Sequence, residues 1–121
     1  MPVVIASVMN IEYWELNANH TPVLDFIEEQ AEAAQAKIQK VTDFFEEQGM
    51  RLLNTQYMSK LKGVDLYELK IKWKGLAYRI FAVIKGSIAY LVHAFIKKTE
   101  NTPMREIKLA LARKSIIEKG N

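Results

Sequence analysis

Three apolar runs that alternate with a period of two residues constrain the fold more than any other feature of this sequence. They cover residues 66–73, 76–85 and 88–97, and the pairs Lys74-Gly75 and Gly86-Ser87 separate them. Such alternation is typical of strands with one buried face. Connections of two residues containing glycine suit tight hairpins. The sequence therefore predicts an antiparallel meander of three strands.

The segment before the meander has the periodicity of a helix. Its apolar stripe, with steps of three and four residues, is formed by Val23, Ile27, Ala31, Ala34, Ile38, Val41 and Phe45. Thr21-Pro22 is a typical helix start, and Gly49 is a typical stop. The stripe fits one long helix or two helices with a break near residues 32–35, and the sequence does not choose between them.

The two ends of the chain complete the expected architecture. Residues 3–9 are rich in β-branched side chains and predict a strand, which residues 11–16 continue or restart. Thr102-Pro103 repeats the helix start, and the helix after it carries Ile107, Leu111 and Ile116 on one side. We expect a single α+β domain over residues 1–121, in which the N-terminal helices and a C-terminal helix pack on a twisted antiparallel sheet.

Composition excludes several classes of protein. The chain has no cysteine, which excludes a disulfide scaffold, a thiolate metal site and a cysteine nucleophile. With two histidines we expect neither a metal site nor a cofactor. The first residues lack the basic region of a signal peptide, and the most apolar stretch, residues 76–96, is interrupted by charges and by Gly86-Ser87. We therefore expect a cytoplasmic protein without a membrane span.

Charge is distributed unevenly between the two halves. Residues 1–60 hold four Lys/Arg and nine Asp/Glu, a net charge of −5, whereas residues 61–121 hold thirteen Lys/Arg and five Asp/Glu, a net charge of +8. This asymmetry predicts a basic surface built by the C-terminal half. Its expected partner is a polyanion such as RNA or DNA, with an acidic protein as the alternative.

The alternation also assigns residues to the two sheet faces. One face has no charge and is expected to meet the helices: Tyr67, Leu69, Ile71, Trp73, Tyr78, Ile80, Ala82, Ile84, Tyr90, Val92, Ala94 and Ile96. The other mixes charged with apolar side chains: Glu68, Lys70, Lys72, Arg79, Phe81, Val83, Lys85, Leu91, His93, Phe95 and Lys97. Cations and rings together suit a nucleic-acid strand, with Lys70 and Lys72 on phosphates and Phe81 and Phe95 stacked on bases. Alternatively, a loop or the terminal helix covers the two rings.

This second face has groups suited to RNA cleavage by the neighbouring 2′-hydroxyl, a reaction that needs no metal. It needs a base, an acid for the leaving oxygen, and cations for the charge that develops on phosphorus. His93 suits either proton-transfer role, and the planar fork of Arg79 can hold two phosphate oxygens. Lys97 and Lys98 are further catalytic candidates as charge stabilisers or bases.

Three segments of the C-terminal half carry a family resemblance. They read LYELKI at 66–71, YRIF at 78–81 and LVHAFIKKTENTPMREIKLA at 91–110. With these motifs the chain resembles the RelE/ParE superfamily of type II toxins, and within it the phage-derived, HigB-like branch. The likeness is sharpest over residues 92–110 and looser over the N-terminal half.

The resemblance implies a RelE-like α+β toxin with two N-terminal helices on a sheet whose other face is basic. Active members cleave mRNA without a metal, commonly on the translating ribosome, and a cognate antitoxin holds them inactive. In the HigB-like branch the antitoxin is usually a small helix-turn-helix protein. The family positions that carry over are Lys70, Arg79, His93, Lys97 and Lys98.

One position departs from the family pattern. Lys70 stands where the family usually has arginine after Glu-Leu, and lysine cannot make the bidentate phosphate contact. Two alternatives to an mRNA endonuclease therefore stay open. One is a degenerate, non-toxic member that keeps only antitoxin or RNA binding, and the other is a gyrase inhibitor of the ParE kind, for which the sequence offers no feature.

Overall fold

The structure is a computed structural model that describes residues 8–120. The strands are β1 (Asn10–Tyr13), β2 (Met58–Lys60), β3 (Tyr67–Trp73), β4 (Leu76–Lys85) and β5 (Ile88–Lys97), and the helices are α1 (Pro22–Glu28), α2 (Glu32–Gln48) and α3 (Met104–Lys119), with a 3₁₀ turn η1 (Gly49–Leu52). The strand predicted over residues 3–9 lies outside the described residues, apart from its last two positions.

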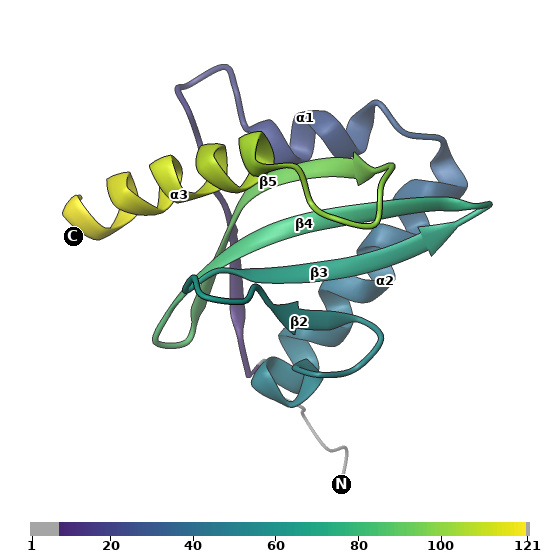
Figure 1. The fold of residues 1–121 in the computed structure, drawn as a ribbon, viewed down its shortest axis with the longest axis horizontal. Helices are drawn as coiled ribbons and strands as arrows, with labels where there is room; N and C mark the ends of the chain where they lie inside the picture. The colour runs from purple at the N-terminus through teal and green to yellow at the C-terminus, as the bar shows by residue number, and fades with distance from the viewer. Residues whose placement is uncertain (1–7, 121) are drawn as a thin grey trace, which may run out of the picture.

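The strands form one five-stranded sheet with the order β1-β5-β4-β3-β2 (Figure 1). Strands β2 to β5 pair antiparallel, as the predicted meander requires, whereas β1 runs parallel to β5. Both residues of the β3–β4 connection, Lys74 and Gly75, have positive φ angles of 46° and 78°. Positive φ at both positions is the backbone of a tight two-residue hairpin, so this turn sets the predicted register. The α+β class is confirmed.

The N-terminal stripe forms two helices rather than one. The break lies at residues 29–31, slightly before the predicted position. Two glutamine side chains satisfy backbone groups there: Gln30 Nε2 donates to the Phe26 carbonyl, and Gln35 Nε2 donates to the Gln30 carbonyl, each at 2.9 Å. Helix α2 ends at Gly49, whose φ of 58° favours glycine, so the predicted stop is confirmed.

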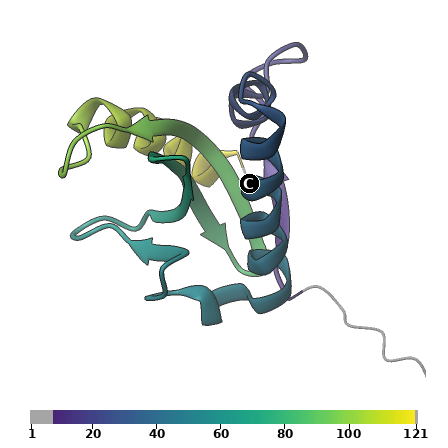
Figure 2. The same cartoon turned by 90° about the vertical axis from the view of Figure 1, so that its right-hand side faces the viewer.

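Helices α1 and α2 lie on one face of the sheet, and α3 lies on the opposite face (Figure 2). The core between the sheet and the N-terminal helices includes Val23, Ile38, Phe45, Leu69, Ile80 and Leu91. Because the apolar stripe of α2 meets the apolar face of the strands, burial of these side chains is the main contribution that fixes the helices on the sheet.

A β-bulge in β5 changes the face on which three residues lie. Phe81 pairs with His93, but the next residue of β4, Ala82, pairs with Leu91, so Val92 is the extra residue. The predicted alternation fails at this point. Val92 and Tyr90 belong to the core under α3, and Leu91 belongs to the core under α1 and α2. Their predicted face assignments were therefore wrong.

Helix α3 covers part of the face that was expected to hold a nucleic-acid strand. The core under it includes Leu66, Phe81, Val83, Val92, Phe95 and Ala110. Ile107 and Ile117 pack against this core, whereas Ile116 is 56% exposed, which corrects its predicted inward position. Arg113 of α3 donates from Nη1 to the Val92 carbonyl at 2.6 Å and lies over the Trp14 ring. The helix is thus attached at the bulge itself, and desolvation there lowers the pKa of Arg113.

Candidate nucleic-acid interface

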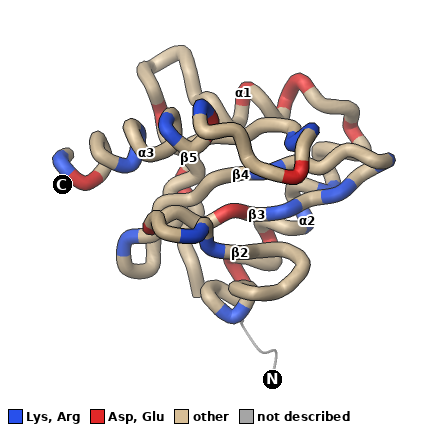
Figure 3. The backbone as a smooth tube through the Cα atoms, viewed as in Figure 1, with Lys and Arg blue, Asp and Glu red and all other residues tan. Residues whose placement is uncertain are grey.

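Near the β3–β4 hairpin the charged face of the sheet is not covered by α3, and its side chains lie there in rows across the strands. One row across the strands is Lys72, Ala77 and Lys97, and the next is Lys70, Arg79 and Phe95. The third row, Glu68, Phe81 and His93, is already partly under α3. Figure 3 shows the cations following one another along β3 toward the hairpin. The open end therefore carries four cations in two adjacent rows.

Two of these cations are directly opposite one another. Lys70 pairs with Arg79 across β3 and β4. Like charges at such a cross-strand position destabilise a sheet, by roughly 0.2–1 kcal/mol on the usual scale of these pairs. An anion bound between them would remove that repulsion. The pair is therefore better suited to hold a ligand than to stabilise the fold.

The guanidinium of Arg79 is fixed by one hydrogen bond and one ion pair, and its Nε–H has no hydrogen-bond partner within residues 8–120. Its Nη1 donates to the Tyr78 carbonyl at 3.2 Å, and its Nε lies 3.6 Å from Oε2 of Glu68. That separation makes an ion pair but no hydrogen bond, and both atoms are buried without a hydrogen-bond partner among the described residues. Glu68 is itself held through Oε1, which accepts a hydrogen bond from Ser59 at 3.1 Å. Nη2 is not among the buried atoms and makes no hydrogen bond within residues 8–120, so it is the nitrogen that can donate to a phosphate oxygen.

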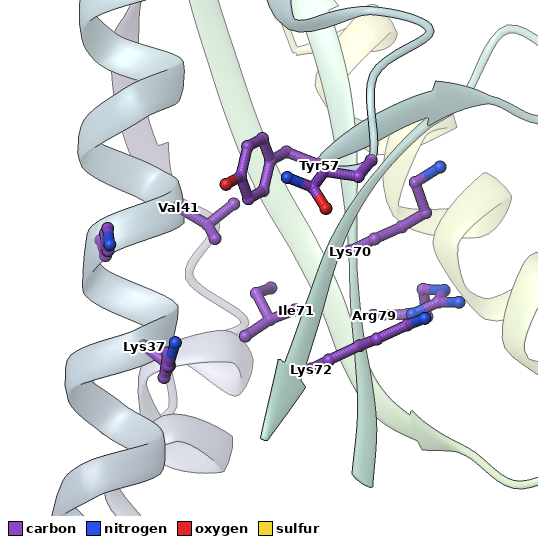
Figure 4. Close-up of a pocket in the computed structure, with 9 residues that line it drawn as sticks. Lys37, Val41, Tyr57, Lys70, Ile71, Lys72 and Arg79 are labelled. Atoms are coloured by element: carbon purple, nitrogen blue, oxygen red, sulfur yellow. The ribbon is translucent and has the colours of Figure 1, made fainter. Parts of the chain in front are cut away.

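A cleft of about 480 Å³ lies around this site and wraps the edge of β3, and we call it the β3 cleft (Figure 4). It is lined by Lys37, Lys40, Val41, Gln56, Tyr57, Lys70, Ile71, Lys72 and Arg79. Lys70, Lys72 and Arg79 point away from α2, while Val41 and Ile71 lie between α2 and β3. The lining thus has five cations and no carboxylate.

Sequence reasoning missed the contribution of α2 to this cleft. Lys37 and Lys40 stand in the acidic half of the chain, and the sequence analysis gave them no functional role. Their spacing of three residues, which places both on one helix face, was the only available signal. Lys40 lies over the Phe44 ring, 5.8 Å from its centroid, and that ring contacts Tyr57 edge-on. The packing of α2 on the sheet brings these groups to β3.

His93 lies in a second cleft, of about 540 Å³, which we call the β5 cleft. Its lining residues are Phe26, His93, Ala94, Phe95, Ile96, Lys98, Thr99, Pro103, Arg105 and Glu106. Nε2 of His93 is 3.0 Å from Oε1 of Glu106, and the imidazole stacks on Phe95 with an angle of 19° between the ring planes. Both side chains of the pair are mostly buried. This contact ties β5 to the first turn of α3.

The predicted site residues are therefore divided. Lys70, Lys72 and Arg79 come together in the β3 cleft, and His93, Phe95 and Lys98 line the β5 cleft. Lys97 shares a row with Lys72 but lines neither cleft. Phe81 is fully buried and Phe95 is 8% exposed, so as placed neither ring offers a face to a base. The alternative left open by the sequence, in which the terminal helix covers both rings, is the observed one.

Neither a metal-ligand cluster nor a membrane-spanning helix is found among the described residues. Over residues 8–120 no group of three or more His, Asp or Glu side chains is placed to hold a metal ion. No helix in this range combines the length and the apolar character that a membrane crossing requires.

Comparison with known families gives one match. The family model described as "Phage derived protein Gp49-like (DUF891)" matches residues 25–115. The matched range includes the second half of α1, all of α2, the whole meander and most of α3. No curated protein matches the chain.

Proposed function

The chain belongs to the phage-derived Gp49-like family, and from this premise we propose that it is the toxin of a type II toxin–antitoxin system. In this proposal the toxin is a HigB-like, metal-independent endoribonuclease that cleaves mRNA on the translating ribosome and so inhibits translation and arrests growth. The fold and the charge of the open sheet end are those expected for such a toxin. Its cellular place is then the cytoplasm, where ribosomes translate.

One observation carries the proposal: Arg79, whose Nη2 makes no hydrogen bond within residues 8–120, lies opposite Lys70 in a cleft whose lining has no carboxylate. In the proposed reaction the 2′-oxygen attacks the adjacent phosphorus and the bond to the 5′-oxygen breaks. The products are a 2′,3′-cyclic phosphate and a 5′-hydroxyl. The extra negative charge on the phosphate oxygens needs fixed cations, and Arg79 with Lys70 supplies them. Lys72 and Lys97, one row away, hold the flanking phosphates.

Two protons must move in this step, one from the 2′-hydroxyl and one to the leaving 5′-oxygen. His93 is the candidate for one of these transfers, with Glu106 orienting its ring through Nε2. Phe95 lies between His93 and Arg79, because it pairs with Arg79 across β4 and β5 and its ring stacks on the His93 imidazole. Lys98, which shares the β5 cleft with His93, is the remaining cation of the proposed catalytic set.

The partners follow from the same proposal. The substrate is mRNA on a ribosome, and the inhibitor is a cognate antitoxin of the helix-turn-helix type that is usual in the HigB-like branch. No cofactor is proposed, because the side chains of the β3 and β5 clefts together supply both the positive charge and the candidate proton donors.

The test is a reconstituted translation reaction with purified protein, in which primer extension maps breaks in the message. The proposal expects cuts that require translating ribosomes and disappear with Arg79→Ala. Circular dichroism establishes that both proteins are folded. Intact message with folded wild-type protein would overturn the endonuclease. A gyrase supercoiling assay on the same protein then tests inhibition of the ParE kind, and a negative result in both leaves the non-toxic binder.

A further inference from the structure

Strand β3 has a free edge at its hairpin end. Strand β2 pairs with β3 only through Met58–Lys60. The pairing continues for one more hydrogen bond, in which the Lys70 N–H donates to the Tyr57 carbonyl at 2.8 Å. The chain then turns away, because the Tyr57 N–H donates to Oγ1 of Thr55 instead of returning to β3. Nothing from β2 covers β3 beyond this point.

Three backbone groups along this edge have no hydrogen-bond partner within residues 8–120. Hydrogen bonds of Leu66 and Lys70 to the β2 side show which residues of this segment face the edge. Every second residue of a strand points its N–H and carbonyl to the same edge, so Lys72 faces this edge as Leu66 and Lys70 do. Its pairing with Ala77 of β4 is then of the non-hydrogen-bonded kind. The Lys72 N–H, the Lys72 carbonyl and the Lys70 carbonyl therefore point outward. No backbone or side-chain group of residues 8–120 makes a hydrogen bond to them.

Cations flank this edge on both sides. Figure 4 shows β3 with α2 on one side, and with the side chains of Lys70, Lys72 and Arg79 on the other. Lys37 and Lys40 line the same cleft from α2. Between them, Ile71 and Val41 are almost fully buried and form an apolar floor. A chain lying along the edge would have positive charge next to both of its faces.

We infer that an extended acidic segment of a partner protein binds here by adding a strand to the free edge of β3. Residues 70–73 offer an edge of roughly 10–14 Å, enough for a short strand. The groups without a partner are one donor, the Lys72 N–H, and two acceptors, the carbonyls of Lys70 and Lys72. They are spaced as in a β-strand, so the N–H and carbonyl groups of an extended peptide can pair with them. A phosphate backbone would match the donor alone. Carboxylates on alternate residues of the segment then meet the α2 lysines, and those on the other face meet the sheet cations.

Edge lysines also keep unrelated strands away from a sheet, because pairing would place their charges against like charges or bury them against apolar side chains. The same lysines attract an acidic strand, so they select one kind of partner. A bound segment would cover Lys70 and Lys72 and keep a phosphate from Arg79. This inhibitory consequence rests on the proposed function, whereas the binding itself does not.

The probe is a fluorescein-labelled octapeptide of alternating glutamate and valine, titrated by fluorescence anisotropy at low salt. We expect saturable binding to the wild type, weakened at least tenfold by the double substitution Lys37→Ala and Lys40→Ala. The matched control removes two lysines of α3, with Lys108→Ala and Lys119→Ala, and should change the affinity less than twofold. An octapeptide with lysine in place of glutamate should not bind.

Two further readouts separate strand addition from simple charge attraction. A peptide of the same sequence with N-methyl groups on alternate residues keeps its charge but cannot complete the ladder, and should lose at least tenfold in affinity. The Lys72 amide should exchange its hydrogen at least tenfold more slowly when the acidic peptide is bound. No binding at 500 µM peptide, equal binding of the N-methylated peptide, equal loss in the two double variants, or an unprotected Lys72 amide would each overturn the inference. Binding without mRNA cleavage would remove the proposed function and leave this inference standing.

Discussion

The β3 cleft and the β5 cleft lie at the same end of the sheet, yet they use charge in opposite ways. The β3 cleft gathers five cations, and its one neighbouring carboxylate, Glu68, is beneath Arg79. In the β5 cleft the carboxylate of Glu106 is bound to His93 and joins β5 to α3. The four lysines of the β3 cleft have no ion pair within residues 8–120 and its lining has no carboxylate, whereas Lys98 and Arg105 of the β5 cleft share their lining with Glu106. The β3 cleft is therefore the better candidate for the phosphate site.

The largest expected effect is the difference in cleavage rate between two variants that each remove one arginine, Arg79 from the β3 cleft or Arg105 from the β5 cleft. Arg79→Ala removes a fixed cation from the developing charge, and loss of one such group costs about 10²–10³ in rate. Arg105→Ala removes the same charge from the β5 cleft and should leave the rate within about threefold. Single-turnover cleavage of message on stalled ribosomes measures both. Equal losses would remove the distinction between the clefts.

Apart from the proton transfer proposed for His93, the His93–Glu106 contact should contribute to the stability of the fold. His93→Ala or Glu106→Ala each removes a mostly buried, charge-assisted hydrogen bond, which is worth about 1.5–3 kcal/mol. The double variant should lose clearly less than the sum of the single losses, because one contact is removed in all three. Urea unfolding measures these free energies. Additive losses would show that the pair does not join β5 to α3.

A third substitution separates ligand binding from positioning within the β3 cleft. Glu68→Gln keeps the shape of the side chain beneath Arg79 but removes its negative charge. RNA affinity should rise about threefold because the cleft becomes more positive, while the cleavage rate should fall about tenfold because the guanidinium loses its ion pair. Anisotropy with a short RNA and single-turnover kinetics give the two values. A parallel change in both would contradict a positioning role for Glu68.

The smallest expected effect is on the salt dependence of RNA binding. Lys72→Ala should lower affinity about threefold and reduce the slope of log affinity against log salt by about 0.7, the value for one phosphate contact on a single strand. Lys108→Ala, on the exposed side of α3, should leave the slope unchanged. Titrations of a labelled RNA at several salt concentrations provide the slopes. Equal slopes in the two variants would place the RNA away from the hairpin end of β3.

Much of the fold could be predicted because its elements follow local patterns. The β4 and β5 strands begin and end at the predicted residues, since the glycine-containing connections define the hairpins. The bulge at Val92 could not be predicted, because it has no glycine or proline and is fixed by contacts with Arg113 of α3. Strand β2 was also missed, since three residues are too few to show a period.

The candidate site was predicted only where one element determines it. Lys70, Lys72 and Arg79 were identified because period-two alternation in two adjacent strands places them together. Lys37 and Lys40 were missed because only the packing of α2 on the sheet brings them near β3. The roles predicted for Phe81 and Phe95 failed for the same reason, since the sequence does not show which part of a sheet face a terminal helix covers.

The most direct measurement is an NMR titration that observes the Nε–H signals of the arginine side chains. The ligand is a short single-stranded RNA with a 2′-deoxy nucleotide at the scissile position, which prevents cleavage by the neighbouring hydroxyl. The account predicts that the Arg79 signal moves with saturable affinity while the Arg105 signal stays in place, because the phosphate binds in the β3 cleft. Movement of the Arg105 signal with a stationary Arg79 signal would contradict the account and assign the phosphate to the β5 cleft.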